Sequence, residues 1–208
     1  MIVLCSNDSS KAFIAFAQKH PHKIGWMLGP THYKTPRPGM QFALDNDAYI
    51  AYRNGKPWKV EAWINFLNKI KASGLTPRWL LVPDVVGRKI ETIESWRYHY
   101  PIAKKYGWPI AFAAQDGMTQ SDVPSGAQIV FVGGTTTWKW KSLPMWCENF
   151  PRVHVGRVNT FERLQIAERN GAESCDGSGF LRCSFHNPRA EGLRIFIEGH
   201  RDKTLQLL

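Results

Sequence analysis

Residues 153–177, VHVGRVNTFERLQIAERNGAESCDG, contain a complete strand–helix–strand unit. The run VHVGRV is apolar and β-branched, which is typical of a buried strand. In the following TFERLQIAERNG, Asn159 or Thr160 offers a side-chain oxygen for a helix N-cap, and Gly171 lies where a helix commonly ends. The run SCDG then predicts a second strand, which ends near Asp176. This order predicts two parallel strands joined by a helical crossover.

The same alternation recurs towards the N-terminus. Short apolar runs lie at 2–5, 24–28, 42–45, 79–84, 110–115 and 129–134, and helix-like segments lie at 11–20, 60–74 and 88–107. With the unit above, the chain has the eight strands that a (β/α)8 barrel requires. We therefore expect an α/β fold, a TIM-like barrel.

One connection departs from a regular barrel. Residues 29–41, GPTHYKTPRPGMQ, contain three prolines and two glycines, so they predict a loop where a helix would be expected. A chain of 208 residues with 43% hydrophobic residues fits one domain with a sizeable core. The prediction is a single domain over 1–208, a compact and somewhat irregular barrel.

The charge of the chain indicates its class of partner. Lys and Arg number 27 against 17 Asp and Glu, a formal charge of +10. So basic a balance favours a polyanionic partner, most commonly nucleic acid. No stretch approaches the roughly 20 apolar residues of a membrane span. We therefore expect a cytoplasmic protein without a membrane partner.

The four cysteines are scattered along the chain without CxxC pairs, so we expect free thiols. One alternative remains open, a late zinc site formed by Cys175, Cys183, His186 and His200.

Polar residues follow the predicted strands at their C-terminal ends, which form the catalytic face of a barrel. They are Asp45, Asp47, Asp84, Gln115, Asp116, Gly133, Gly134, Arg157 and Asp176. A single aspartate after a strand is commonly a turn or cap residue, but six such strand ends predict one shared pocket. Carboxylates crowded in a pocket repel one another, which lets one stay protonated while another is ionised. Glycosyl transfer needs that division between an acid and a nucleophile.

In their order, these motifs resemble the tRNA-guanine transglycosylase superfamily, and more closely its short phage-type DNA 7-deazaguanine transglycosylases. The resemblance covers roughly residues 42–182. It implies that Asp176, in RNGAESCDGSGFLR, is the nucleophile and that Asp45, in FALDNDAY, is the acid and base. Asp47 stands where the family usually has glycine.

The resemblance also implies how guanine would be bound. Asp84, in WLLVPDVVG, would accept from the guanine N1–H and amino group, as a carboxylate can accept two parallel donors. Gln115, in AFAAQDG, and the backbone N–H groups of Gly133 and Gly134, in IVFVGGTTTWK, would reach the guanine carbonyl.

The chain lacks the zinc-binding Cys-x-Cys-x-x-Cys and distant histidine of the tRNA enzymes. We therefore expect a barrel without the zinc module, no metal and no organic cofactor. The missing module favours DNA over tRNA as the partner, together with a free 7-deazaguanine base such as preQ0 or preQ1. For a phage-encoded protein the location would be the host cytoplasm.

A base inside a duplex must be extruded before its glycosidic bond can reach a barrel mouth. Candidate phosphate-binding residues lie in the loops of the catalytic face: His32, Lys34, Arg37, Lys139, Lys141 and Arg157, with Arg182 added by the resemblance. The segment TTTWKWK, residues 135–141, alternates aromatic and basic side chains, which favours base stacking by Trp138. Its alternative interpretation is the start of a helix with Trp138 or Trp140 packed inward.

Three other functions remain as alternatives to DNA base exchange. They are a tRNA-guanine transglycosylase, a nucleoside deoxyribosyltransferase or glycosylase acting on small substrates, and a non-catalytic nucleic-acid-binding barrel. The basic charge disfavours small substrates, and the joint presence of Asp45, Asp84, Gln115 and Asp176 disfavours a non-catalytic protein.

Overall fold

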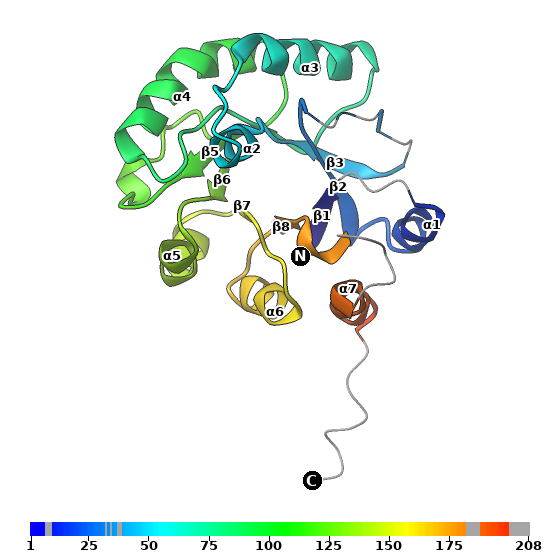
Figure 1. Cartoon of the computed structure of the whole chain (residues 1–208). Coiled ribbons are helices and arrows are strands. Elements are labelled where there is room, and N and C mark those ends of the chain that lie inside the picture. The colour runs from blue at the N-terminus through cyan, green and yellow to red at the C-terminus, as the bar shows by residue number, and fades with distance from the viewer. Residues whose placement is uncertain (7–9, 32, 34, 37–38, 182–187, 200–208) are drawn as a thin grey trace.

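Eight parallel strands close into a barrel with helices around it (Figure 1). The computed structural model describes residues 1–6, 10–31, 33, 35–36, 39–181 and 188–199. The strands are β1 (Ile2–Ser6), β2 (Ile24–Leu28), β3 (Gln41–Leu44), β4 (Leu80–Leu81), β5 (Ile110–Ala114), β6 (Ile129–Val132), β7 (Val153–Val155) and β8 (Ser174–Gly177). Each pairs with the next, and β8 pairs with β1. The predicted TIM barrel is confirmed.

The helices surround the strands. They are α1 (Lys11–Lys19), α2 (Ala48–Arg53), α3 (Val60–Ala72), α4 (Lys89–Lys104), α5 (Thr136–Asn149), α6 (Phe161–Arg169) and α7 (Pro188–Glu198), with 3-10 turns η1 (Gln120–Asp122) and η2 (Gly179–Leu181). The four predicted helices correspond to α1, α3, α4 and α6. Helix α5 starts within TTTWKWK, whereas α2 and α7 were not predicted. In the part of the chain that the structure describes, no helix has the length and apolar character needed to cross a membrane.

Local sequence explains where the helices begin and end. The Ser10 side chain accepts a hydrogen bond from the N–H of Phe13 at the start of α1, and Thr160 accepts one from Arg163 at the start of α6. These bonds satisfy N–H groups that have no partner within the helix. Gly171, with a φ of 85°, follows α6 as expected.

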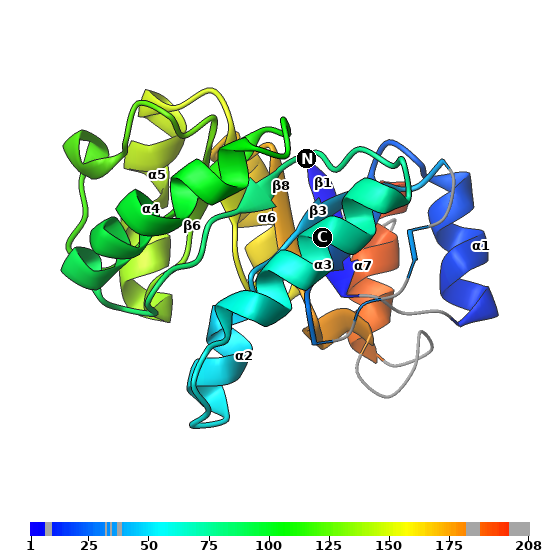
Figure 2. The ribbon, with the colours of Figure 1, turned by 90° about the horizontal axis from the view of Figure 1, so that it is seen from above.

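The barrel is irregular at two connections. Between β2 and β3, the described residues of 29–40 contain no helix, as the prolines predicted. Between β5 and β6 the described chain forms only the short turn η1. Other crossovers carry an α-helix, and the one between β3 and β4 carries two, α2 and α3. Helix α2 stands out from the barrel (Figure 2).

Side chains alternate between the barrel interior and the helix layer, as the period of two in a strand requires. The interior cluster consists of Leu4, Met27, Ala43, Trp79, Leu81, Ala111, Ala113 and Ile129. The ring of Trp79 is buried there and lies 4.8 Å from the ring of His154. In β8, Cys175 belongs to the outer cluster, so Ser174 and Asp176 point inward by the same alternation.

A charged cluster lies where β7 and β8 begin. Glu173 accepts hydrogen bonds from Arg152, at 2.6 Å to Nε and 3.0 Å to a terminal nitrogen, and it also accepts one from Arg78. These contacts join the start of β8 to the residues just before β4 and β7. The cluster is therefore at the amino-terminal end of the barrel, opposite the predicted site.

Candidate active site

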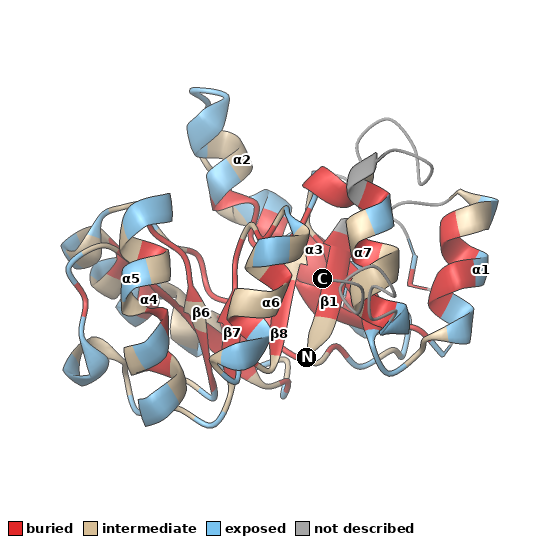
Figure 3. Cartoon of the chain, turned by 90° about the horizontal axis from the view of Figure 1, so that it is seen from below, coloured by how far each residue is buried: buried red, intermediate tan, exposed pale blue. Residues whose placement is uncertain are grey.

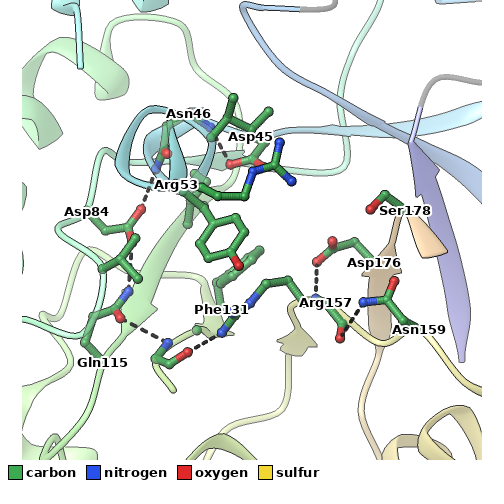
Figure 4. A pocket seen from close by; sticks show the side chains of 16 residues that line it. Asp45, Asn46, Arg53, Asp84, Gln115, Phe131, Arg157, Asn159, Asp176 and Ser178 are labelled. Atoms are coloured by element: carbon green, nitrogen blue, oxygen red, sulfur yellow. Dashed lines mark hydrogen bonds between the residues drawn. The ribbon is translucent and has the colours of Figure 1, made fainter. Parts of the chain in front are cut away.

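The carboxyl ends of the strands surround a cavity of about 530 Å³ (Figure 4). Its lining includes seven of the nine predicted residues, from six consecutive strands: Asp45, Asp84, Gln115, Gly133, Gly134, Arg157 and Asp176. The prediction that six strand ends converge on one pocket is therefore confirmed. Asp47 and Asp116 are not among the lining residues.

Asp45 follows β3 directly and is held by the turn that comes after it. Its Oδ1 accepts hydrogen bonds from the backbone N–H groups of Asn46, at 2.7 Å, and Asp47, at 3.3 Å. Burial raises the pKa of Asp45 well above its usual value, and the negative charges of Asp47, Asp176 and Asp84 raise it further. The Asp45 carboxyl is thus suited to carry a proton.

Asp84 lies between two amide side chains. Asn46 donates from Nδ2 to Asp84 Oδ1 at 2.8 Å, and Gln115 donates from Nε2 to Asp84 Oδ2 at 2.7 Å. Burial raises the pKa of Asp84 to about 6, although the hydrogen bond from Asn46 lowers it in part. Asp84 is therefore mainly a carboxylate at neutral pH, and each oxygen keeps a lone pair for another donor.

Gln115 is anchored at both ends of its amide. Its Oε1 accepts from the N–H groups of Gly87, at 2.8 Å, and Gly134, at 3.0 Å. The N–H of Gly133 is also used within the protein, because it donates to Ala114 O at 3.0 Å. The prediction that the two glycine N–H groups face the substrate is therefore wrong; they hold Gln115 and the strand in place.

Gly134 is required for a conformational reason. Its φ is 62°, and a Cβ there would lie 2.5 Å from Asp116 Oδ2 and 2.6 Å from the Trp138 ring. A larger residue would be strained in this conformation and would displace both neighbours.

Asp176 ends β8 and accepts two hydrogen bonds. Its Oδ1 is 3.1 Å from the backbone nitrogen of Arg157 and 3.1 Å from Nε2 of His154. In the described chain, the hydrogen bonds that reach this carboxylate from other residues go to Oδ1. Oδ2 therefore keeps its lone pairs for chemistry.

His154 was not predicted as a site residue, although the alternation of VHV places it inside the barrel. Burial lowers its pKa, which favours the neutral ring. Its Nδ1 lies 2.9 Å from Ser174 Oγ. A neutral ring that donates from Nε2 to Asp176 must accept at Nδ1, so the Ser174 hydroxyl donates there. His154 and Ser174 thereby orient the Asp176 carboxylate.

Arg157 brings a positive charge into the cavity. It adopts a φ of 58°, and its guanidinium donates to Gly134 O and lies 4.6 Å from the centre of the Tyr49 ring. In Figure 4, the Asp84 and Gln115 pair lies on the other side of the cavity from Asp176, and Arg157 extends between them. Asp84 with Gln115 and Asp176 with Arg157 thus face the same cavity.

The TTTWKWK segment forms the start of α5, and the structure contradicts one of the residues predicted from it. Lys139 is only 1% exposed, and its Nζ donates to Gly156 O. The prediction that Lys139 contacts phosphate is therefore wrong, because solvent and ligands cannot reach its amine. Trp138 and Trp140 pack against the core, which fits the alternative interpretation, whereas Lys141 is exposed.

Asp47 and Asp116 stabilise turns. Asp47 has a φ of 59°, a conformation that favours glycine, the residue usual in the resembled family. Its Oδ2 accepts from the N–H of Thr31 at 2.6 Å. Asp116 accepts from the N–H of Thr135 at 2.7 Å, at the start of α5. Asp116 thus holds the start of α5, whereas Asp47 makes no side-chain capping bond to α2 and instead ties the residues after β2 to those after β3.

Several predicted residues lie outside the described part of the chain: His32, Lys34, Arg37 and Arg182, and from the alternative zinc site Cys183, His186 and His200. Cys175 is buried, which raises the pKa of its thiol well above the usual value. Across the described ranges, no three His, Cys, Asp or Glu side chains are grouped so that they could hold a metal ion.

Comparisons with known proteins place the chain by its fold. No family model and no curated protein matches the sequence. Among solved structures, it is similar to a mutant tryptophan synthase alpha-subunit from Pyrococcus furiosus, with a TM-score of 0.57, 16% identity and 94% of both chains covered. It is also similar to a chain of the BexX/CysO complex of Amycolatopsis orientalis, with a TM-score of 0.57, 12% identity and coverage of 96% of this chain and 92% of that one. Likeness at such low identity shows a shared barrel fold and leaves the substrate open.

Proposed function

We propose that this protein is a transglycosylase that exchanges guanine in DNA for a 7-deazaguanine through a covalent aspartyl–sugar intermediate. The observation that carries the proposal is the pairing of two unlike carboxyl groups in one cavity. Asp45 has a raised pKa and suits an acid, whereas Asp176 is oriented by two hydrogen bonds and keeps one oxygen for attack. Retaining glycosyl transfer needs these two roles.

In the first half-reaction, Asp176 Oδ2 forms a bond to C1′ of the target nucleotide. The C1′–N9 bond breaks, and its electron pair leaves with the guanine. Protonated Asp45 gives its proton to the leaving base. The products are a sugar ester on Asp176, free guanine and an Asp45 carboxylate.

In the second half-reaction, the incoming 7-deazaguanine gives its N9 proton to the Asp45 carboxylate. N9 then attacks C1′, and the C1′–oxygen bond to Asp176 breaks with its electrons returning to the carboxylate. Both aspartates are restored to their starting states. The exchange involves no net oxidation or reduction.

Asp84 and Gln115, on the other side of the cavity from Asp176, would bind the base. The free lone pairs of Asp84 suit the guanine N1–H and amino group. Gln115 carries a second Nε2 hydrogen, which suits the carbonyl oxygen. Because both bases share this edge, one pocket can bind the leaving guanine and the incoming 7-deazaguanine in turn.

The test is incorporation of radiolabelled guanine, followed by labelled 7-deazaguanine bases, into DNA, tRNA and free deoxynucleosides in parallel. We expect wild-type protein to label DNA. The Asp176→Asn variant should lose at least about 10³-fold of that activity, because no comparable nucleophile remains. Asp122→Asn makes the same chemical change outside the cavity and should retain wild-type activity.

Labelling of a substrate other than DNA would identify one of the alternative functions. Labelling of tRNA alone would indicate a tRNA-guanine transglycosylase, and labelling of nucleosides alone an enzyme for small substrates. No labelling of any substrate, or full activity in Asp176→Asn, would overturn the proposal. A denaturing gel should also show a protein–DNA adduct in wild type that Asp176→Asn does not form.

A further inference from the structure

The segment that projects from the catalytic face has an unusual composition. We call residues 48–59, AYIAYRNGKPWK, the α2 projection; they comprise α2 and the loop that leads to α3. The segment contains Arg53, Lys56 and Lys59 and no acidic residue, and all three cations are exposed. Figures 2 and 3 show α2 standing away from the barrel with exposed residues towards its far end. A concentrated positive charge on a projecting element fits a polyanionic ligand.

Aromatic side chains accompany these charges. Tyr52 is 67% exposed, which is high for a large aromatic residue. Tyr49, one helical turn earlier, is 38% exposed and lies beneath the guanidinium of Arg157. Residues three apart on a helix lie on the same side of it. The projection therefore carries two neighbouring tyrosine rings beside its cations, a combination typical of surfaces that bind nucleic-acid strands.

The projection is continuous with the cavity. Tyr49, Ile50 and Arg53 line the cavity from α2, alongside Asp45, Asp84 and Asp176. The opposite side of the helix lines a second hollow of about 410 Å³, to which Lys56 and Lys59 contribute. A strand bound along α2 would therefore lie next to the cavity that holds the carboxylates.

The base of the projection is tied to the site. Trp58 donates from Nε1 to Asn46 O at 2.7 Å, and the Asn46 side chain donates to Asp84. The Trp58 ring also packs edge-on against His99, with centroids 5.4 Å apart. These contacts fix the position of α2 relative to the carboxylates, so a strand bound on the projection would be held in register with them.

We propose that the α2 projection is the docking element for the DNA strand that carries the target guanine. Arg53 binds a phosphate on the side of α2 that faces the cavity, Lys56 and Lys59 bind phosphates beside the second hollow, and Tyr52 stacks on a base next to the extruded nucleotide. This inference rests on the proposed function and adds to it the surface that holds the polymer. Extrusion leaves a gap in the base stack, and the exposed Tyr52 ring, one helical turn from the cavity-lining Tyr49, is suited to fill it.

The first test is the salt dependence of binding to a fluorescein-labelled DNA duplex, measured by anisotropy. We expect the triple variant Arg53→Gln, Lys56→Gln, Lys59→Gln to bind more weakly and less salt-dependently. Each lost phosphate contact should reduce the slope of log K against log salt by about 0.9. The control, Lys19→Gln, Lys104→Gln, Lys105→Gln, removes three exposed lysines at the C-terminal ends of α1 and α4 and should keep the wild-type slope.

The second test concerns stacking. Tyr52→Ala should lower base exchange on duplex DNA by roughly 10-fold and lower it less on a single strand, where no gap has to be filled. Tyr98→Ala removes a similarly exposed ring, 72% exposed on α4, and should leave both rates unchanged.

Binding and exchange are separate readouts, so the two proposals fail differently. If wild type binds DNA through the projection but exchanges no base, the docking surface stands and the proposed function falls. If DNA exchange occurs and the triple variant binds like wild type, the docking surface falls and the function stands. Failure of wild type to bind DNA, or binding of an RNA hairpin alone, would also overturn the docking surface.

Discussion

At the scale of single residues, the proposed base exchange depends on the different environments of chemically similar carboxyl groups. The partial burial of Asp45 raises its pKa, and the charges of three other aspartates raise it further, so its environment favours the protonated form. Replacing it with asparagine keeps the shape and removes the exchangeable proton. We expect Asp45→Asn to lower base exchange by about 10²- to 10⁴-fold, the usual contribution of a general acid or base. Single-turnover release of labelled guanine measures this directly.

The same substitution should change how stability depends on pH. The pKa of Asp45 lies above its unfolded value in the folded protein, so the folded state binds the proton more tightly. Wild type therefore loses stability as pH rises from about 4 until the raised folded pKa is passed. Asp45→Asn lacks this loss, so its melting temperature relative to wild type should be higher at about pH 8 than at about pH 4. An equal difference at both pH values would contradict the raised pKa.

His154 is a positioning residue in this interpretation, because it acts through Asp176. His154→Phe keeps an aromatic ring between Trp79 and Phe131, which lie 4.8 Å from it, and removes the donor. We expect kcat to fall by roughly 10-fold or more with KM little changed, since the base-reading pair is untouched. Ser174→Ala should have a smaller effect in the same direction.

A matched control for His154→Phe is His20→Phe, which changes a half-buried histidine at the C-terminal end of α1, outside the cavity lining. It should leave kcat and KM as in wild type. If His154→Phe raised KM and left kcat unchanged, the positioning role would be wrong.

Residue type and position predicted much of the site but not its internal bonds. Asp45, Asp84, Gln115 and Asp176 could be predicted because carboxylates and amides interrupt apolar strands at one end. His154 could have been found from its inward position in VHV, but a histidine between valines also fits a buried strand. The use of the Gly133 and Gly134 N–H groups depends on contacts across strands, which spacing along the chain does not reveal.

At the scale of elements, α5 supports the site through Lys139. Its buried amine donates to Gly156 O, next to Arg157, whose N–H binds Asp176. Lys139→Met removes that donor and leaves a buried carbonyl unsatisfied, which costs about 1–3 kcal/mol of unfolding free energy. Base exchange should fall as well, because the turn that holds Asp176 loses its support. Lys141→Met, an exposed lysine of the same helix, should change neither.

The titration of Lys139 gives a second readout. Burial, aided by the positive charge of Arg157, lowers the pKa of Lys139 from 10.5 to about 8. The unfolded chain then binds more protons than the folded one between these values, so wild-type stability should rise from about pH 8 to about pH 10 through this group. Chemical denaturation at both pH values should show a smaller rise for Lys139→Met. Equal changes in stability with pH for wild type and Lys139→Met would contradict the lowered pKa of Lys139.

Elements differed in how well the sequence predicted them. All eight strands lie within or next to the predicted runs, because each crossover brings the chain back to the same buried layer. Helix α2 was missed because it is six residues long and exposed, so it has no apolar periodicity to detect. The alternation in TTTWKWK suggested a stacking surface, whereas a helical period places Lys139 inward and buries it.

At the scale of the whole molecule, the two ends of the barrel differ in the kinds of charged groups that they carry. The carboxyl end gathers partly buried acids whose raised pKa values oppose folding at neutral pH. The interior beneath them is filled by apolar side chains around Trp79. The amino end carries the ion cluster of Arg78, Arg152 and Glu173. Ion pairs at the amino end can therefore offset the electrostatic repulsion among the carboxyl groups that the proposed function requires at the other end.

This division predicts that Glu173→Gln separates stability from activity. Glu173 loses its charge while Arg78 and Arg152 keep theirs, so we expect a loss of about 1–2 kcal/mol and a drop in melting temperature of about 2–6 °C. Base exchange below the melting transition should be unchanged, because the substitution lies at the opposite end of the barrel from the carboxylates. Glu148→Gln, an exposed residue of α5, is the control.

The pH dependence of this variant has the opposite sign to that of Asp45→Asn. Although partial burial acts to raise it, hydrogen bonds from Arg152 and Arg78 hold the pKa of Glu173 below its usual 4.5. The stabilisation is therefore complete above the unfolded value of 4.5 and is lost as pH falls through the lower folded pKa. The difference in melting temperature between wild type and Glu173→Gln should shrink as pH falls below about 4. If Glu173→Gln instead lost activity while melting like wild type, the separation of a stabilising end from a catalytic end would be wrong.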